Sequence, residues 1–103
     1  MICAEFFHSD ELFKGFDISG HAGYAESGRD IVCASVSSAV QFAVNLLDDF
    51  DCDPIVNVSD NLVSCRITAS ENTADAIIGV FRNHLESILE EFPDTINITI
   101  SEV

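Results

Sequence analysis

Two stretches near the start of the chain predict strands, the first because it contains β-branched and aromatic residues and the second because Leu12, Phe16 and Ile18 recur at even spacing. The first strand is expected from Ile2 to Phe7 and the second from Leu12 to Ile18. The segment HSDE between them supplies turn residues, which places His8 in the turn. Gly20 and Gly23 follow the second stretch, so we expect a hairpin that ends there.

The pattern then changes to a helical one. From Ile31 to about Asp49, apolar residues cover most of the circumference of a helix, which is typical of a helix buried on more than one side. Asp30 precedes it, and its carboxylate can accept backbone N–H groups of the first turn as an N-cap. Serines, Gln41 and Asn45 interrupt this run, whereas a membrane span needs about 20 mostly apolar residues. We therefore expect a core helix and no membrane partner.

The second half of the chain returns to short alternating stretches. A strand is expected from Ile55 to Val58, and the segment SDN then turns the chain. Apolar and polar residues alternate from Val63 to Ala69, which predicts a half-buried strand. A last strand with the same alternation is expected from Ile96 to Ile100.

A second helix separates the last two of these strands. Apolar residues recur at intervals of three and four over residues 74–89, so this helix packs by one face, and Asn72 or Thr73 is expected to cap it. The predicted order is β-β-α-β-β-α-β. This order favours an α+β two-layer sandwich, a mainly antiparallel sheet with two helices on one face. The 103 residues fit a single domain, and the edge strands of so small a sheet make a homodimer plausible.

Charge narrows the classes of partner. The chain has 18 acidic and 4 basic residues, a net charge of −14. Because proteins bind phosphate backbones through Lys and Arg, nucleic acid is not expected as a direct partner, whereas a basic protein would be attracted. Acidity that merely keeps a protein dispersed is the plainer explanation of the charge. The first residues carry no basic leader, so we expect no signal peptide and a cytoplasmic location.

The cysteines do not form a recognisable framework. Cys3, Cys33, Cys52 and Cys65 include no C-x-x-C pair, so neither a disulfide scaffold nor a zinc ribbon is expected. Cys3 and Cys65 fall within strand patterns and are expected to be buried, and Cys52 is expected at an exposed helix exit. Pro54 stands where a calcium loop needs glycine. We therefore expect no metal and no cofactor.

Cys33 is the candidate nucleophile. With Asp30 as N-cap, it lies at the third helical position, where unsatisfied N–H groups and the helix dipole favour an anion such as a thiolate. His21 lies twelve positions earlier and can act as base, and the N–H groups of Cys33 and Ala34 would face an oxyanion. Ser37, one turn further on, can hold the site by a hydrogen bond or bond back to the helix. From these residues alone, a buried core cysteine is the commoner outcome.

The segment between the two candidates is expected to be a loop from Ala22 to Arg29. Tyr24 and Arg29 in this loop are candidates for contacting a substrate, with the loop closing over the site. Solvated loop residues fit the same pattern. His84 is expected on the surface of the second helix.

Two separated motifs carry a resemblance to a known family. The segment SGHAGYAESGRDIVCASVSSAV resembles the ribosomal-processing cysteine protease family, whose hallmark is Gly-His-Ala, a short loop, then Asp-Ile-Val-Cys-Ala and a Ser-containing helix. The matching residues are Gly20, His21, Ala22, Asp30, Ile31, Val32, Cys33, Ala34 and Ser37.

The resemblance implies a fold and a function. It implies a single cysteine protease domain over residues 1–103, an α+β fold and a homodimer. Cys33 would be the nucleophile and His21 the base, with Gly20, Asp30, Ala34 and Ser37 supporting or positioning them. The implied substrate is the twenty-seventh large-subunit ribosomal protein, which loses an N-terminal extension by a cut after phenylalanine. A basic ribosomal protein would also give the acidic charge a purpose.

Other classes of function remain open at this level. A non-enzymatic acidic module could bind a basic ribosomal protein with Cys33 merely buried, and a thiol redox sensor could use Cys33 without hydrolysis. Thiol reactivity separates these classes, because a core cysteine is inert, a sensor reacts and stops, and a protease also turns over peptide.

Overall fold

The computed structural model describes residues 1–20 and 27–103, and within the first helix the side chains from residue 31 on. These residues form seven elements in the predicted order. The elements are β1 (Ile2–Ser9), β2 (Leu12–Gly20), α1 (Ser27–Asp49), β3 (Ile55–Ser59), β4 (Leu62–Arg66), α2 (Glu71–Glu91) and β5 (Ile96–Glu102).

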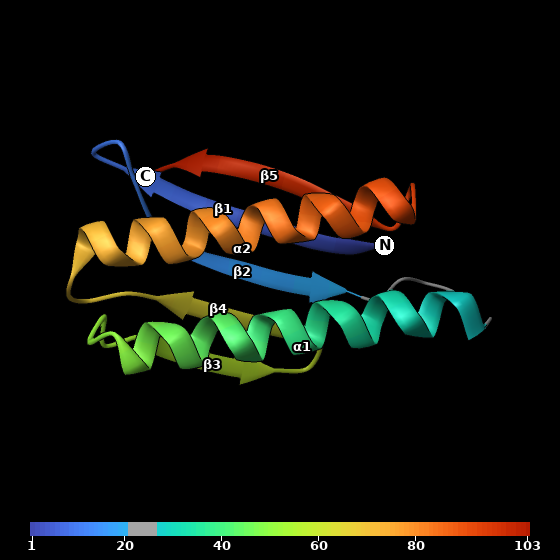
Figure 1. Cartoon of the computed structure of the whole chain (residues 1–103), viewed down its shortest axis with the longest axis horizontal. Helices are drawn as coiled ribbons and strands as arrows, with labels where there is room; N and C mark the ends of the chain where they lie inside the picture. Colours follow the sequence, from blue (N-terminus) through green and yellow to red (C-terminus); the bar gives the residue numbers. More distant parts are fainter. Residues whose placement is uncertain (21–26) are drawn as a thin grey trace.

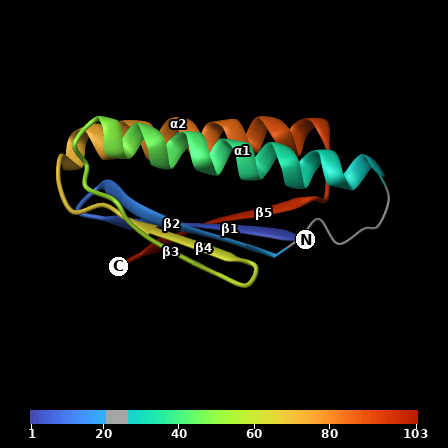
Figure 2. The same cartoon turned by 90° about the horizontal axis from the view of Figure 1, so that it is seen from below.

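The described strands form a five-stranded sheet in the order β3-β4-β2-β1-β5. Neighbouring strands are antiparallel except β1 and β5, which run parallel. Figures 1 and 2 show α1 and α2 side by side on one face of this sheet. The predicted α+β two-layer sandwich is therefore confirmed.

Alternation along the strands decides which residues enter the core. Ile2, Ala4 and Phe6 of β1 are buried, while Cys3 between them is exposed. The prediction that Cys3 is buried is wrong, because its side chain points to the opposite face of the sheet from those of Ile2 and Ala4. Cys65 is buried as predicted, paired with Phe16 across β2 and β4, and burial raises the pKa of its thiol to about 11.

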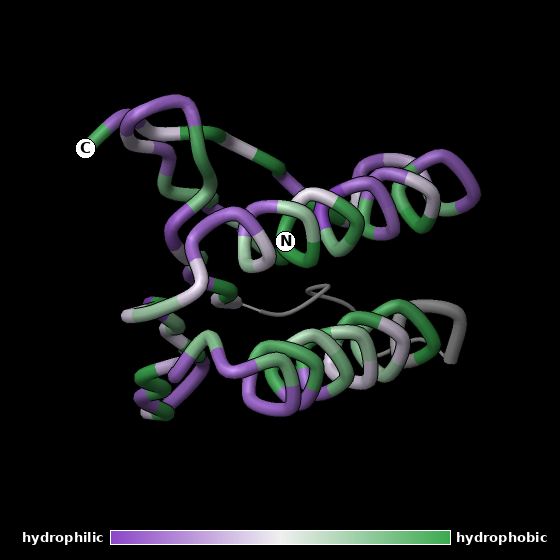
Figure 3. Tube along the Cα trace, turned by 60° about the vertical axis from the view of Figure 1, so that its left-hand side comes forward, coloured by the Kyte–Doolittle hydropathy of each residue, from purple (hydrophilic) through white to green (hydrophobic). Residues whose placement is uncertain are grey.

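The helix α1 is unusually apolar for its degree of burial. Val32, Val36, Val40 and Leu47 are buried in the core, and Figure 3 shows hydrophobic colouring over most of α1, whereas α2 mixes hydrophobic and hydrophilic residues. By length and composition alone, the segment Ile31–Asp49 could also cross a membrane, as many core helices of soluble proteins could. Only 33% of its most apolar part is buried inside the protein. The exposed apolar part of α1 therefore needs an explanation of its own.

The segment around Cys52 departs from the sequence prediction. The strand expected to reach Ala69 ends at Arg66, because the backbone N–H groups of Thr68 and Ala69 both donate to the Cys52 carbonyl at 3.1 Å. Cys52, expected to be exposed, is fully buried, and its thiol lies 3.8 Å from the carbonyl oxygen of Phe50. The chain thus folds over the end of α1 and encloses this cysteine.

Two further local predictions are wrong. The N-cap of α2 is Ser70 and not Asn72 or Thr73, which lie inside the helix, and the Ser70 hydroxyl donates to the Asp51 carbonyl at 2.9 Å. His8 lies in β1 and not in a turn, with its Nδ1 2.8 Å from Glu102 Oε1 of β5.

Candidate active site

The helix that carries Cys33 begins earlier than predicted. Because α1 starts at Ser27, Asp30 lies inside the helix and Cys33 in its second turn, so the prediction of an N-cap at Asp30 is wrong. The residues from Ser27 to Arg29, expected in the loop, are helical too. The dipole effect is strongest in the first turn, and N–H groups inside a helix are used by its own carbonyls. The expected placement of Cys33 in the first turn of the helix is therefore wrong.

Cys33 lines a cavity of about 310 Å³ under α1, at the end of the sheet where β2 stops and β3 turns into β4. The structure brings Gly20, Cys33 and Ser37 together in its wall, three residues that the sequence selected. Cys33 itself is half-buried, so its sulfur has both protein and open space around it. The remaining lining residues are Ile2, Ile18, Ser19, Val36, Val40, Gln41, Ser59, Asn61, Leu62 and Val63.

Gly20 is held tightly at the rim of this cavity. Its φ of +84° lies in the left-handed region, and a Cβ on it would lie 2.5 Å from the carbonyl oxygen of Met1. Its N–H donates to the carbonyl of Asn61 in the β3–β4 turn at 3.0 Å. Only glycine meets both constraints without strain. The backbone of Gly20 is therefore fixed between Met1 and the β3–β4 turn.

The chemistry of the lining is apolar below and polar at the rim. The residues contributed by the hydrophobic core form the apolar part, and none of the described lining residues carries a formal charge. Ser37, Gln41 and Asn61 provide neutral hydrogen-bonding groups of the kinds that stabilise oxyanions. Such a cavity can hold an apolar side chain while a thiol attacks the bond beside it.

Sequence reasoning missed Gln41 and Asn61. A helical signal for Gln41 was present, because Cys33, Ser37 and Gln41 are spaced by four residues and so share a face of α1. Asn61 lies on a turn that only the pairing of β2 with β4 brings to this end of the sheet.

Other predicted site residues are placed elsewhere or are not described. Ala34 lines a different cavity, on the side of α1 that faces α2. His21 and Tyr24 lie outside the described residues, as do the side chains of Arg29 and Asp30. Their roles stay predictions. Across residues 1–20 and 27–103, no group of three or more His, Cys, Asp or Glu residues is arranged to hold a metal ion.

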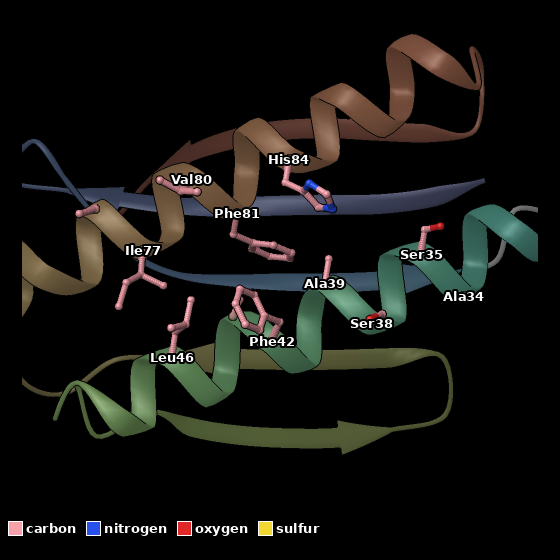
Figure 4. Close-up of a pocket in the computed structure, with 12 residues that line it drawn as sticks. Ala34, Ser35, Ser38, Ala39, Phe42, Leu46, Ile77, Val80, Phe81 and His84 are labelled. Carbon is pink, nitrogen blue, oxygen red and sulfur yellow. The ribbon is translucent and has the colours of Figure 1, made fainter.

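The cavity that Ala34 lines is a groove of about 850 Å³ between the helices. Figure 4 shows Phe42 of α1 and Phe81 and His84 of α2 directed into it. Phe42 is 67% exposed and Val80, also in its wall, is 68% exposed. His84 is exposed on α2, as predicted. This groove holds no thiol among its lining residues, so we assign the chemistry to the Cys33 cavity.

Comparison with known proteins points to one family. The family model described as cysteine protease Prp matches residues 1–97. The ribosomal processing cysteine protease Prp of Bacillus subtilis is 47% identical over 36 residues, which make up 35% of this chain and 32% of that protein. The matched segment thus spans about a third of the curated relative's length.

Solved structures agree over nearly the whole chain. The essential ribosomal processing protease Prp of Staphylococcus aureus, in complex with a covalently linked product peptide, has a TM-score of 0.87 at 26% identity, covering 98% of this chain and 100% of that one. The same protease with a substrate peptide gives a TM-score of 0.86 at 25% identity and the same coverage. The Streptococcus mutans protein SMU.848 has a TM-score of 0.85 at 25% identity, covering 100% of this chain and 96% of that one.

Proposed function

Because this chain belongs to the cysteine protease Prp family, we propose that it is a cysteine endopeptidase that trims a ribosomal protein. The observation that carries the proposal is the cavity in which Cys33, Ser37 and Gly20 meet, with the motif histidine next in the chain after Gly20. A nucleophile, hydrogen-bond donors and space for a substrate side chain are then in one place.

The proposed reaction uses Cys33 as nucleophile and the motif residue His21 as base. The thiol gives its proton to the His21 imidazole, and Sγ bonds to the scissile carbonyl carbon. The imidazolium then protonates the leaving amine as the C–N bond breaks, which leaves a thioester. Water attacks the thioester and passes a proton to His21, which returns it to the thiol as the acid leaves. His21 is the group on which the first step depends.

The substrate we propose is the twenty-seventh protein of the large ribosomal subunit, cut after a phenylalanine of an N-terminal extension. The names of the relatives support ribosomal processing, and the apolar lining of the cavity suits an aromatic side chain. The net charge of −14 favours association with a basic ribosomal protein. Such a substrate also implies that the enzyme works in the cytoplasm, where ribosomes are assembled.

The test is mass spectrometry of a peptide that spans the extended N-terminus of that ribosomal protein. Wild type should cut it once, after phenylalanine, and Cys33→Ala should not cut it. Cys3→Ala is the matched control, because Cys3 is an exposed thiol on the opposite face of the sheet from the helices and should be dispensable.

Each outcome assigns the protein to a class. Cleavage that persists in Cys33→Ala would refute the nucleophile. A folded wild-type protein that binds the peptide without cutting it would favour the acidic binding module. A Cys33 that reacts with peroxide in a protein that never turns over peptide would favour the redox sensor.

We further propose a homodimer built on the groove between α1 and α2. Two chains of charge −14 repel each other unless they meet on an uncharged surface, and none of the groove's described lining residues is acidic. The groove also has small residues, such as Ser35 and Ala39, beside the large and exposed Phe42 (Figure 4). In a two-fold contact, Phe42 of each chain can pack against the small residues of the other.

A further inference from the structure

The strand β3 is an edge of the sheet that nothing in the described residues covers. It pairs with β4 on one side only, and every one of its residues is exposed. We propose that the outer edge of β3 binds the substrate chain as an added strand and leads its scissile bond to Cys33. This inference rests on the proposed protease function and adds the surface that holds the substrate.

Within β3 itself the exposed residues are mostly apolar and none is charged. Ile55 is 55% exposed and Val58 is 74% exposed. Natural edge strands are usually protected by charges, proline or a bulge, and the β3–β4 register from Ile55 to Ser59 runs without interruption. Unpaired backbone N–H and C=O groups along a strand edge can bind an extended peptide, and the side chains beside them add apolar contact.

The opposite edge of the sheet is different. In β5 the exposed positions are Asn97, Thr99, Ile100 and Glu102, of which only Ile100 is apolar, and the hydroxyl of Ser101 donates to Glu5 Oε2 at 2.6 Å. Glu102 at its end is paired with His8 of β1. The strand β5 therefore carries a charged residue and polar contacts to β1, whereas β3 contains no charged residue.

The β3 edge is continuous with the Cys33 cavity. Ser59, the last residue of β3, lines that cavity together with Cys33. The row of Cys33, Ser37 and Gln41 borders the same space from α1. A chain that pairs along β3 and passes Ser59 therefore approaches the cavity that contains Cys33.

The charges around this strand select the partner. All the charged residues from position 48 to position 60 are acidic, namely Asp48, Asp49, Asp51, Asp53 and Asp60. They are exposed and flank β3 at both of its ends. An extended segment with lysine or arginine on either side of an apolar stretch complements this arrangement. A second copy of this chain does not, since pairing β3 with β3 would bring two sets of aspartates together.

The first test is a scan of backbone N-methylation along the substrate peptide, omitting the residues that flank the scissile bond. In an added strand, only alternate N–H groups face the protein. We expect kcat/KM to fall by about tenfold at every second residue of the paired segment, the effect of one lost hydrogen bond, and by less than about twofold at the residues between. A uniform effect, or none, in a peptide that wild type cuts and Cys33→Ala does not, would overturn the β3 proposal and leave the protease intact.

The second test is on the protein. Val58→Lys should raise KM about tenfold with kcat unchanged, because it adds a positive charge and removes apolar contact where a basic peptide lies. Ile100→Lys is the control, since Ile100 is 49% exposed on the other edge strand and the change in charge is the same; its KM should stay within about twofold. Equal effects of both variants would refute the proposal. The proposal would also be refuted if Val58→Lys lost a dimer while its KM stayed at the wild-type value, because the β3 edge would then be a contact with a second copy of the chain.

Discussion

The helix α1 borders a cavity on one side and a larger groove on the other, and the two differ in chemistry more than in size. The cavity of about 310 Å³ contains Cys33 and a rim of neutral hydrogen-bonding groups. The groove of about 850 Å³ is lined by small and aromatic residues and one histidine. The boundary between the two hollows on α1 falls between adjacent serines, since Ser37 lines the cavity and Ser38 lines the groove. The larger hollow is therefore the poorer candidate for thiol catalysis, because no cysteine lines it.

His21 of the family motif and His84 of the groove give the sharpest test of this contrast. His21→Ala should lower kcat/KM by about 100- to 10,000-fold, the usual cost of a missing general base. His84→Ala, in the groove, should lower it by less than about twofold, because that imidazole meets no reacting atom. Steady-state cleavage of the same peptide measures both. A comparable loss in His84→Ala would move the base to the groove and end the division of roles.

A charge in the groove should separate association from catalysis. Phe42→Asp should weaken the dimer by about 30-fold or more, as expected for an aromatic residue at the centre of an interface. Asn45→Asp is the matched control, an exposed residue of α1 with the same change in charge outside both sets of lining residues.

Sedimentation equilibrium measures the dimer constant of each variant. Dimers of unchanged stability in Phe42→Asp would show that the groove is not the contact. A monomeric variant that still cleaves peptide at the wild-type rate per chain would confirm that the two sides of α1 act independently.

The neighbouring serines allow a test by size. Ser37→Phe should fill part of the cavity and lower kcat/KM by about tenfold, equivalent to ~1.4 kcal/mol of lost apolar contact with the substrate. Ser38→Phe adds the same volume on the groove side and should leave peptide cleavage within about twofold. Both residues are exposed, so both variants should fold. The reverse order of effects would place the substrate between the helices.

The smallest effect is expected on the open face of the sheet, away from both hollows. Burial alone would raise the pKa of Asp17, but hydrogen bonds from Arg66 and Ser64 and the guanidinium charge hold it below its ordinary 3.8. Arg66 Nη1 donates to Asp17 Oδ1 at 2.9 Å. Because the folded-state pKa is depressed, this stabilisation is present above pH 3.8 and is lost as the pH falls through the lower, folded-state value.

Asp17→Asn should therefore cost less than about 1 kcal/mol at neutral pH, since both groups are partly solvated. The difference between wild type and variant should shrink as the solution is acidified below pH 3.8. Urea unfolding at several pH values measures it. A stability difference that grows on acidification would contradict the assignment of the ion pair. A change in kcat/KM in Asp17→Asn would contradict the view that this pair takes no part in the site.

Strand parity explains where sequence reasoning about the fold succeeded and where it failed. The alternation around Phe16 and Cys65 predicted two strands and a buried thiol, and both are present. The same alternation assigns Cys3 to the exposed face once the register of β1 is known. The local pattern shows that a strand is half-buried, but a lone small apolar residue does not reveal which half it occupies.

The sequence by itself determined the order of the elements, the layer architecture and the choice of Cys33, because hydrophobic periodicity and a two-part motif are properties of neighbouring residues. Only the tertiary structure decided what surrounds Cys33. Asn61 and Ser59 reach the cavity through pairing of strands, Ala34 turns away from it because adjacent residues of a helix point in different directions, and the start of α1 moves Cys33 into the second turn. These are long-range or geometric outcomes, and the free energy that fixes them comes from packing α1 and α2 on the sheet, which no local pattern encodes.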